Sequence, residues 1–167
     1  MQVRPADPAE IDHLARLWYD SWHETHAPLS PPELIRLRTL TSFRDRLQAA
    51  LPSVSVVGPI GGPLGFCTLK DDELNQLFVS ADAHGSGVAA ALIADAEARL
   101  VARGVTTAWL ACAIGNYRAA RFYEKSGWDM AGRFVVASET SIGPFPVEHW
   151  RYEKRLIGST SAFLWSP

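Results

Sequence analysis

Residues 74–104 read LNQLFVSADAHGSGVAAALIADAEARLVARG and combine a strand-like run, a glycine-rich turn and a helical pattern. Apolar residues recur every fourth position from Val88 to Leu100, which predicts a helix with one buried stripe, and Gly104 follows as a terminating glycine. The first amides of such a helix have no intrahelical acceptor, and small residues before it let backbone N–H groups surround an anion. The stretch therefore predicts a phosphate-binding turn, with an ordinary turn before a core helix as the alternative.

Two common phosphate-binding loops fit this stretch poorly. A P-loop ends in Gly-Lys followed by Ser or Thr, whereas Gly87 is followed by Val88. Residues 85–90 satisfy the dinucleotide-binding pattern G-x-G-x-x-G/A, but that pattern also needs an acidic residue about 20 positions on, at the end of the next strand. The next strand-like run, residues 106–112, contains no acidic residue. An unrelated nucleotide-binding domain is therefore the least favoured interpretation.

The glycine-rich loop instead resembles the acetyl-CoA motif of the GNAT superfamily of N-acetyltransferases. That motif reads Q/R-x-x-G-x-G/A and follows a strand that ends in an L-Y-V-like triplet. Gly87 and Ala89 match it, and Phe78 stands where tyrosine is usual. His84 departs from the Gln or Arg position, which weakens one side-chain contact to phosphate but leaves the backbone amides available.

A second segment resembles the same family. Residues 116–128 read NYRAARFYEKSGW, which is similar to the family's N-x-x-A-x-x-F-Y-x-x-x-G-F segment, with Trp128 in place of phenylalanine. The segment lies one strand beyond the loop, in the expected order. Two motifs in that order are more specific than either alone, and the resemblance is sharpest between Glu73 and Gly132.

The resemblance implies an α/β (α+β) fold with a mixed, mostly antiparallel seven-stranded sheet and helices on both faces. It implies a single N-acetyltransferase domain over residues 1–157, followed by a C-terminal tail over residues 158–167. The implied activity is transfer of the acetyl group of acetyl-CoA to a primary amine, by direct attack in a ternary complex. The alternative is a regulatory module of the same fold that binds acetyl-CoA or CoA without turnover.

The resemblance also implies where the cosubstrate acetyl-CoA binds. Backbone amides from Gly85 to Ala89 are expected to surround the pyrophosphate, and the backbone of Leu77 and Val79 is expected to pair with pantetheine. The expected cofactor-binding residues are Leu77, Phe78, Val79, His84, Gly85, Ser86, Gly87, Val88, Ala89, Asn116 and Tyr123.

The reaction needs a proton acceptor and a proton donor. An alkylamine with a pKa near 10.4 is mostly protonated at neutral pH, so a base must free it. The resemblance implies Glu73 as this base, with a solvated carboxylate at a turn as the alternative. It implies Tyr123 as the acid that protonates the CoA thiolate, with simple packing as the alternative. Tyr123 lies about two helical turns after Asn116 and shares its face, whereas Phe122 is expected to face the core.

The end of the first predicted helix contains the expected acceptor-binding residues. In the family this region forms one wall of the acceptor site, so the resemblance implies that Trp22, His23, Glu24 and His26 bind the amine. Core packing of Trp22 and a solvated cluster of the other three are the alternatives. If Glu73 is not the base, His23, Glu24 and His26 are the next candidates.

Local signals predict several other elements. Residues 7–10 read DPAE, which predicts a helix start with an aspartate N-cap, a proline at the first position and a glutamate capping box. Ser42 is expected to cap a later helix. The last two strands are expected over residues 128–136 and 147–156, with a loop over residues 137–146 that borders the acceptor site.

The overall charge indicates which partners to expect. The 167-residue chain has a formal net charge of −2, so it shows neither the basic patch of a nucleic-acid-binding protein nor a basic membrane helix. We therefore expect no nucleic acid and no membrane as partners, and an amine substrate that is a small molecule or a peptide. The sequence does not decide between a monomer and a homodimer.

The cysteines and the apolar runs indicate the compartment. Cys67 and Cys112 both lie in apolar strand-like runs, which favours buried free thiols in a reducing environment. No Cys or His spacing suggests a metal site, so no metal is expected. We recognise no signal peptide and no apolar run long enough to span a bilayer, and we expect a cytoplasmic protein.

Overall fold

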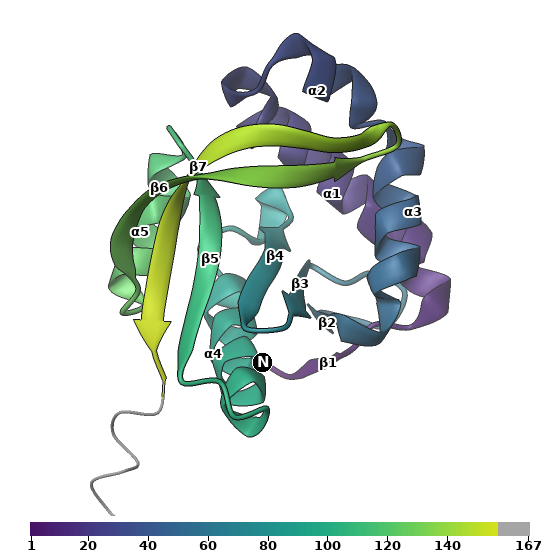
Figure 1. The fold of residues 1–167 in the computed structure, drawn as a ribbon. Coiled ribbons are helices and arrows are strands. Elements are labelled where there is room, and N and C mark those ends of the chain that lie inside the picture. Colours follow the sequence, from purple (N-terminus) through teal and green to yellow (C-terminus); the bar gives the residue numbers. More distant parts are fainter. Residues whose placement is uncertain (157–167) are drawn as a thin grey trace, which may run out of the picture.

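A seven-stranded sheet forms the centre of the molecule in the computed structural model, which describes residues 1–156 (Figure 1). The strands are β1 (Val3–Pro5), β2 (Val54–Val57), β3 (Gly65–Lys70), β4 (Glu73–Val79), β5 (Thr107–Ala113), β6 (Asp129–Thr140) and β7 (Gly143–Arg155). Their order is β1-β2-β3-β4-β5-β7-β6, and all neighbours are antiparallel except β4 and β5. The expected mixed, mostly antiparallel sheet is confirmed. The predicted tail over residues 158–167 lies outside the described residues.

Helices cover both faces of the sheet (Figure 1). One face carries α1 (Ile11–Thr25), α2 (Pro32–Leu37) and α3 (Leu40–Ala50), and the other carries α4 (Val88–Ala102) and α5 (Tyr117–Lys125). Short 3-10 turns lie at Pro8–Glu10, Ala27–Leu29, Leu51–Ser53 and Ala81–Ala83. Each face has its own hydrophobic core: Leu74 of β4 packs into the α4 and α5 core, and Phe78 of the same strand into the α1 and α3 core.

The parallel strands β4 and β5 diverge almost at once. They pair only at Glu73 and Trp109, at the start of β4, whereas β3 pairs with β4 as far as Val79. The register between β3 and β4 shifts at Leu69, which leaves Asn75 as an extra residue in β4. Beyond Glu73, the β5-facing edge of β4 therefore has no strand to pair with, and we call this opening the β4–β5 split.

Two local predictions are corrected by the structure. Thr39, not Ser42, is the N-cap of α3: its hydroxyl oxygen accepts a hydrogen bond from the Ser42 amide at 3.1 Å. The loop expected over residues 137–146 is instead part of a long β6–β7 hairpin. Proline has no backbone N–H to donate, so it fits a strand only where no neighbouring strand needs that donor. Pro144 and Pro146 meet this condition because β5 pairs with β7 only from His149 onward, which leaves the β5-facing edge of β7 unpaired at both prolines.

The long hairpin reaches across the molecule to the N-terminal helices (Figure 1). Phe145 and Val147 of β7 pack against the α1 and α3 core, and the backbone oxygen of Glu139 in β6 accepts a hydrogen bond from Arg38. A wall of β-structure therefore faces the end of α1 and the start of α3.

The predicted helix start at residues 7–10 is confirmed and is fixed by a buried ion pair. Asp7 caps the turn, and the Glu10 carboxylate, only 1% exposed, accepts hydrogen bonds from the amides of Asp7 and Gly61. Arg4 donates to both oxygens of the same carboxylate at 2.9 and 2.7 Å. The pKa of Glu10 is lowered to about 2, mainly by the hydrogen bond from Arg4 and with a contribution from the two amides, while burial opposes the shift.

We predict that Glu10→Gln lowers the free energy of unfolding by about 3 kcal/mol, because it leaves a partly buried Arg4 without its partner. The ionised Glu10 stabilises the fold above its unfolded pKa of about 4.3, and this contribution is lost as the pH falls toward 2. Urea unfolding should show that the free energy of unfolding falls more between pH 7 and pH 3 for the wild type than for the variant. The exposed pair of Asp12 and Arg44 gives a control: Asp12→Asn should change stability by less than about 1 kcal/mol. Equal stability of Glu10→Gln and wild type at pH 7 would contradict this account.

Candidate active site

The glycine-rich loop between β4 and α4 presents open backbone. Gly85 and Gly87 have φ values of +78° and +91°, which side-chain-bearing residues rarely adopt. A Cβ added to Gly85 would meet no atom within 4 Å, so the space before the loop is free. Gly87 is the N-cap of α4 and offers no side-chain cap, so within residues 1–156 the amides of Val88 and Ala89 have no acceptor. These amides are available to an anion, as the sequence predicted.

Loop side chains hold the loop closed rather than reaching into the open space. His84 Nε2 donates a hydrogen bond to the backbone oxygen of Val79 at 3.2 Å, and the Ser86 hydroxyl donates to the oxygen of Ala83. Leu77 and Val79 are partly buried against the α4 core, and Phe78 is buried on the opposite face. The predicted cofactor residues from Leu77 to Ala89 therefore lie together along the end of β4 and the start of α4.

The second motif forms the start and body of α5. Asn116 is its N-cap, as expected: its side-chain oxygen accepts a hydrogen bond from the Ala119 amide at 3.3 Å. Phe122 packs against the α4 and α5 core, as expected, but Tyr123 is the more deeply buried of the two rings. Tyr123 is only 8% exposed and packs against Trp128 and Tyr152, while Phe122 is partly buried.

Tyr123 has an environment that keeps its phenol protonated. Burial raises its pKa, and the nearby thiols of Cys112 on β5 and Cys67 on β3 raise it further. These two strands flank β4, so the ring lies beneath the sheet close to the β4–β5 split. Cys67 and Cys112 are themselves buried free thiols, as expected, and burial raises the pKa of each to about 12.

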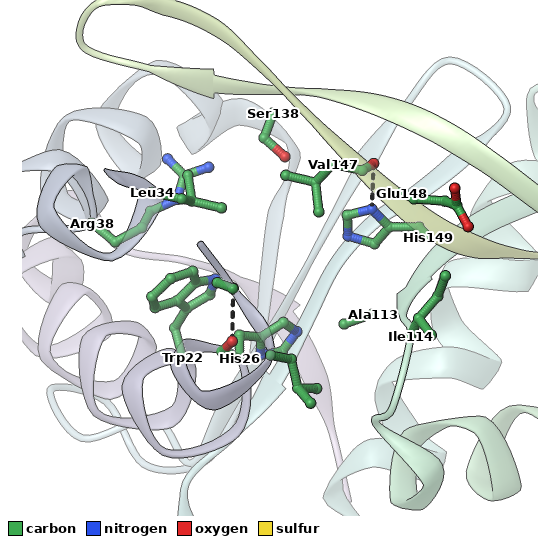
Figure 2. A pocket seen from close by; sticks show the side chains of 12 residues that line it. Trp22, His26, Leu34, Arg38, Ala113, Ile114, Ser138, Val147, Glu148 and His149 are labelled. Atoms are coloured by element: carbon green, nitrogen blue, oxygen red, sulfur yellow. Dashed lines mark hydrogen bonds between the residues drawn. The ribbon is translucent and has the colours of Figure 1, made fainter. Parts of the chain in front are cut away.

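A cavity of about 90 Å³ lies at the mouth of the split, between the end of α1, the segment leading to α2, and β7 (Figure 2). His26 and His149 line it from opposite sides of the split. The ring of His26 lies 5.5 Å from that of Phe78 on β4, and His149 pairs in register with Ala113 at the end of β5. Other lining residues include Trp22, Leu34, Arg38 and Ile114.

Hydrogen bonds fix the tautomer of both imidazoles. A carbonyl oxygen can only accept, so His149 Nδ1 donates to the oxygen of Val147 at 3.1 Å and Nε2 keeps its lone pair. The Thr25 hydroxyl donates to the oxygen of Ser21, so its oxygen accepts from His26 Nδ1 at 2.7 Å. Both rings therefore offer an Nε2 lone pair, and Figure 2 shows them on the cavity wall.

Both imidazoles are neutral at neutral pH. Burial lowers the pKa of His26 to about 4, and the nearby His149 contributes to the shift. Burial also lowers the pKa of His149, although the Val147 hydrogen bond opposes the change. Two neutral acceptors at one cavity suit a ligand with N–H donors, such as an amine.

The structure separates the other predicted acceptor residues. Trp22 and His26 line the cavity, whereas His23 Nε2 donates to the backbone oxygen of Arg38 at 2.7 Å and Glu24 is exposed on α1. His149 was missed by the sequence analysis. The sequence offered only a weak signal for it, because His149 is one of several polar residues that alternate along a predicted strand.

Glu73 lies away from this cavity. It begins β4 where β4 and β5 still pair, and it is not among the residues that line the cavity. Burial raises the pKa of its carboxyl group, which is the direction a general base at neutral pH requires, while a hydrogen bond from Asn75 and the charge of Lys70 oppose the shift.

Within residues 1–156, no cluster of three or more His, Cys, Asp or Glu side chains has the arrangement of a metal site. None of the helices in that part of the chain is both long enough and apolar enough to cross a membrane.

Comparisons with known proteins agree with the geometry. The family model described as "Acetyltransferase (GNAT) family" matches residues 11–128. The peptidyl-lysine N-acetyltransferase YjaB of Salmonella typhimurium is 30% identical over 136 residues, which covers 81% of this chain and 88% of that protein.

Solved structures show the same fold. A GCN5-related N-acetyltransferase from Rhodopseudomonas palustris superimposes with a TM-score of 0.73 at 23% identity, over 93% of this chain and 95% of the other. The protein yncA from Salmonella typhimurium, whose structure was solved with its cofactor acetyl-CoA, superimposes with a TM-score of 0.69 at 15% identity, over 93% of this chain and 94% of the other. The protein therefore belongs to the GNAT family of acetyltransferases.

Proposed function

We propose that this GNAT protein transfers the acetyl group of acetyl-CoA to a primary amine, by direct attack in a ternary complex. One observation carries the proposal: two neutral imidazoles lie at the mouth of the β4–β5 split, His26 against β4 and His149 against β5. An amine that binds between them stands beside the opening where the thioester would lie. The alternative, a module that binds CoA without turnover, has no specific observation in its favour.

The exposed loop and the split fit the two ends of acetyl-CoA. The pyrophosphate would bind the open amides between Gly85 and Ala89, where the α4 dipole also favours negative charge. The pantetheine arm would pair with the unpaired edge of β4 at Leu77 and Val79. Asn116 and Tyr123 approach from the α5 side of the sheet.

The groups proposed to move protons are already in the states that the reaction needs: the imidazoles are neutral and the Tyr123 phenol is protonated. A neutral imidazole can accept a proton from the acceptor ammonium, which frees the lone pair that attacks the thioester carbonyl. As the C–S bond breaks, the CoA thiolate takes a proton from the Tyr123 hydroxyl. A thiol near pKa 8.5 is a far stronger acid than a buried phenol, so this transfer is uphill by itself. It proceeds only if the phenolate regains a proton, and the nitrogen releases one as the amide forms.

A coupled assay tests the function. Thiol release from acetyl-CoA is followed with a panel of amino acids, polyamines, aminosugars and a lysine peptide, the last because the Salmonella relative is named a peptidyl-lysine N-acetyltransferase. Amine-dependent thiol release supports the proposal. Thermal stabilisation by acetyl-CoA without thiol release for any amine would support the binding module instead.

We predict that Gly87→Glu weakens acetyl-CoA binding at least about 100-fold while the protein stays folded, because a carboxylate at the start of α4 would repel the pyrophosphate. Calorimetric titration measures the affinity. Gly104→Glu is the control, since Gly104 at the other end of α4 also has a positive φ, +83°, and open space around it. Unchanged affinity in Gly87→Glu would show that the loop does not bind the phosphates.

We predict that Tyr123→Phe lowers kcat about 100-fold or more, in line with general-acid contributions, with little change in acetyl-CoA affinity. The substitution keeps the buried ring and removes only the hydroxyl. Tyr117→Phe is the control, because Tyr117 lies on the same helix but is 64% exposed. A near-normal kcat for Tyr123→Phe, with chemistry limiting the rate, would leave proton delivery to water.

The identity of the base is decided by pH profiles of two variants. Glu73 remains our sequence prediction, and His149 is the candidate that the geometry adds. Loss of the base should make kcat/KM follow the fraction of free amine, which rises about tenfold per pH unit up to about pH 10.4. We predict this steep profile for His149→Asn and the wild-type profile for Glu73→Gln. The opposite pattern would assign the role to Glu73.

A further inference from the structure

Arg38 is a buried cation on the cavity wall. It follows α2 and is only 3% exposed, and it belongs to the residues that line the cavity. Nη1 donates to the backbone oxygen of Glu139 at 2.6 Å, while Nε is buried and has no hydrogen-bond partner among the residues that the structure describes. Nη2 also forms no hydrogen bond within residues 1–156. The edge of the guanidinium formed by Nε and Nη2 is therefore unused.

No carboxylate in the described part of the chain forms an ion pair with Arg38, although the charge of Glu139 raises its pKa against the effect of burial. Glu148 is the acidic residue that lines the cavity, and it already forms an ion pair with Arg133 at 3.2 Å. The Glu139 carboxylate is 77% exposed and lies 3.9 Å from Lys70. Residues 157–167 contain no aspartate or glutamate. A buried charge without a partner is costly, which indicates that an anion from outside the chain completes this site.

A second arginine adds to the positive charge. Arg46 lies with its guanidinium carbon 4.4 Å from the Trp18 ring centroid, and the charge of Arg38 helps to lower its pKa to about 9. Burial is the largest cause of that shift and lowers the pKa of Arg38 as well, while the charge of Glu139 opposes both shifts. The region beside the cavity is therefore positive, which favours an anion.

The unused edge of Arg38 suits a carboxylate. A guanidinium edge that presents two N–H donors binds both oxygens of a carboxylate at once, and such a bidentate pair is stronger and more specific than a single hydrogen bond. Figure 2 shows Arg38 and His149 on opposite sides of the cavity, with Ala113 on the side of His149. A ligand that spans the cavity would thus meet a cation at one end and an imidazole lone pair at the other.

We propose that the acceptor is an amino acid, whose carboxylate binds Nε and Nη2 of Arg38 while its amine faces Nε2 of His149. This inference rests on the proposed function, because it identifies the acceptor class of the same site. The amine then lies on the side of the cavity that borders β5 and the split, and the carboxylate lies on the far side. A lysine side chain presented by a peptide with blocked termini carries no free α-carboxylate and would leave Arg38 without an anion.

The test compares acceptors that differ only in the carboxylate. Thiol release from acetyl-CoA is measured with L-lysine and cadaverine, L-alanine and ethylamine, and 4-aminobutyrate and propylamine, together with the remaining protein amino acids and a lysine peptide with blocked termini. We expect a carboxylate-bearing acceptor to have kcat/KM at least about 10-fold above that of its partner without the carboxylate, in line with a hydrogen-bonded charge pair. The blocked peptide should be a poorer acceptor than the amino acids.

Two variants assign the preference to Arg38. Arg38→Met should reduce the preference for the carboxylate to about 1, mainly through KM. It should still fold, because the loss of one hydrogen bond to the backbone oxygen of Glu139 is offset by removal of a buried cation that has no ion-pair partner within residues 1–156. Arg38→Lys keeps the charge without the paired donors, and it should retain only part of the preference. Arg36→Met is the control, since Arg36 lies exposed on α2, and it should keep the wild-type preference.

Three results would overturn the inference. Equal kcat/KM for members of each pair, or a blocked lysine peptide as the best acceptor, would show that no carboxylate is recognised while the acetyltransferase function stands. A carboxylate preference that survives in both Arg38→Met and Arg38→Lys would place the anion elsewhere. Absence of thiol release with every amine, despite acetyl-CoA binding, would overturn the proposed function and this inference together.

Discussion

The early end of pairing between β4 and β5 is the constraint on which the site depends. After Glu73 and Trp109 the two parallel strands separate, so the edge of β4 that would pair with β5 stays open. Backbone donors and acceptors rarely remain without partners inside a protein, and an open strand edge favours an extended ligand. The glycine-rich loop lies at the end of the same strand, so one element fixes both ends of the proposed acetyl-CoA site.

The rest of the fold holds this split in place from both faces. The α4 and α5 core brings Tyr123 beneath it, and the α1 and α3 core brings His26 against Phe78 above it. The β6–β7 hairpin then completes the cavity, because it supplies His149 and also holds the Arg38 guanidinium through the backbone of Glu139. Acetyl-CoA and the acceptor would therefore meet between helices and strands that are each packed against one of the two hydrophobic cores.

The sequence predicted local features well and long-range ones poorly. The helix starts at Asp7 and Asn116 were confirmed because a cap depends on neighbours three residues away. The sheet type followed from the family resemblance. His149 and Arg38 could not be found in this way, because their role arises only when β7 and the α2–α3 region meet across the cavity. The depth of burial of Tyr123 could not be predicted either, since neighbouring aromatic residues in a short helix do not show which ring the core takes up more fully.

Amide hydrogen exchange with and without acetyl-CoA tests the central claim most directly. If acetyl-CoA occupies the split and the loop, peptides that cover residues 74–90 should become protected, because open amides of β4 and α4 gain acceptors and lose solvent. Peptides from the β6–β7 hairpin tip around residues 139–144 should change little, since the tip lies away from the split. Strong thermal stabilisation by acetyl-CoA without added protection in residues 74–90 would contradict the account.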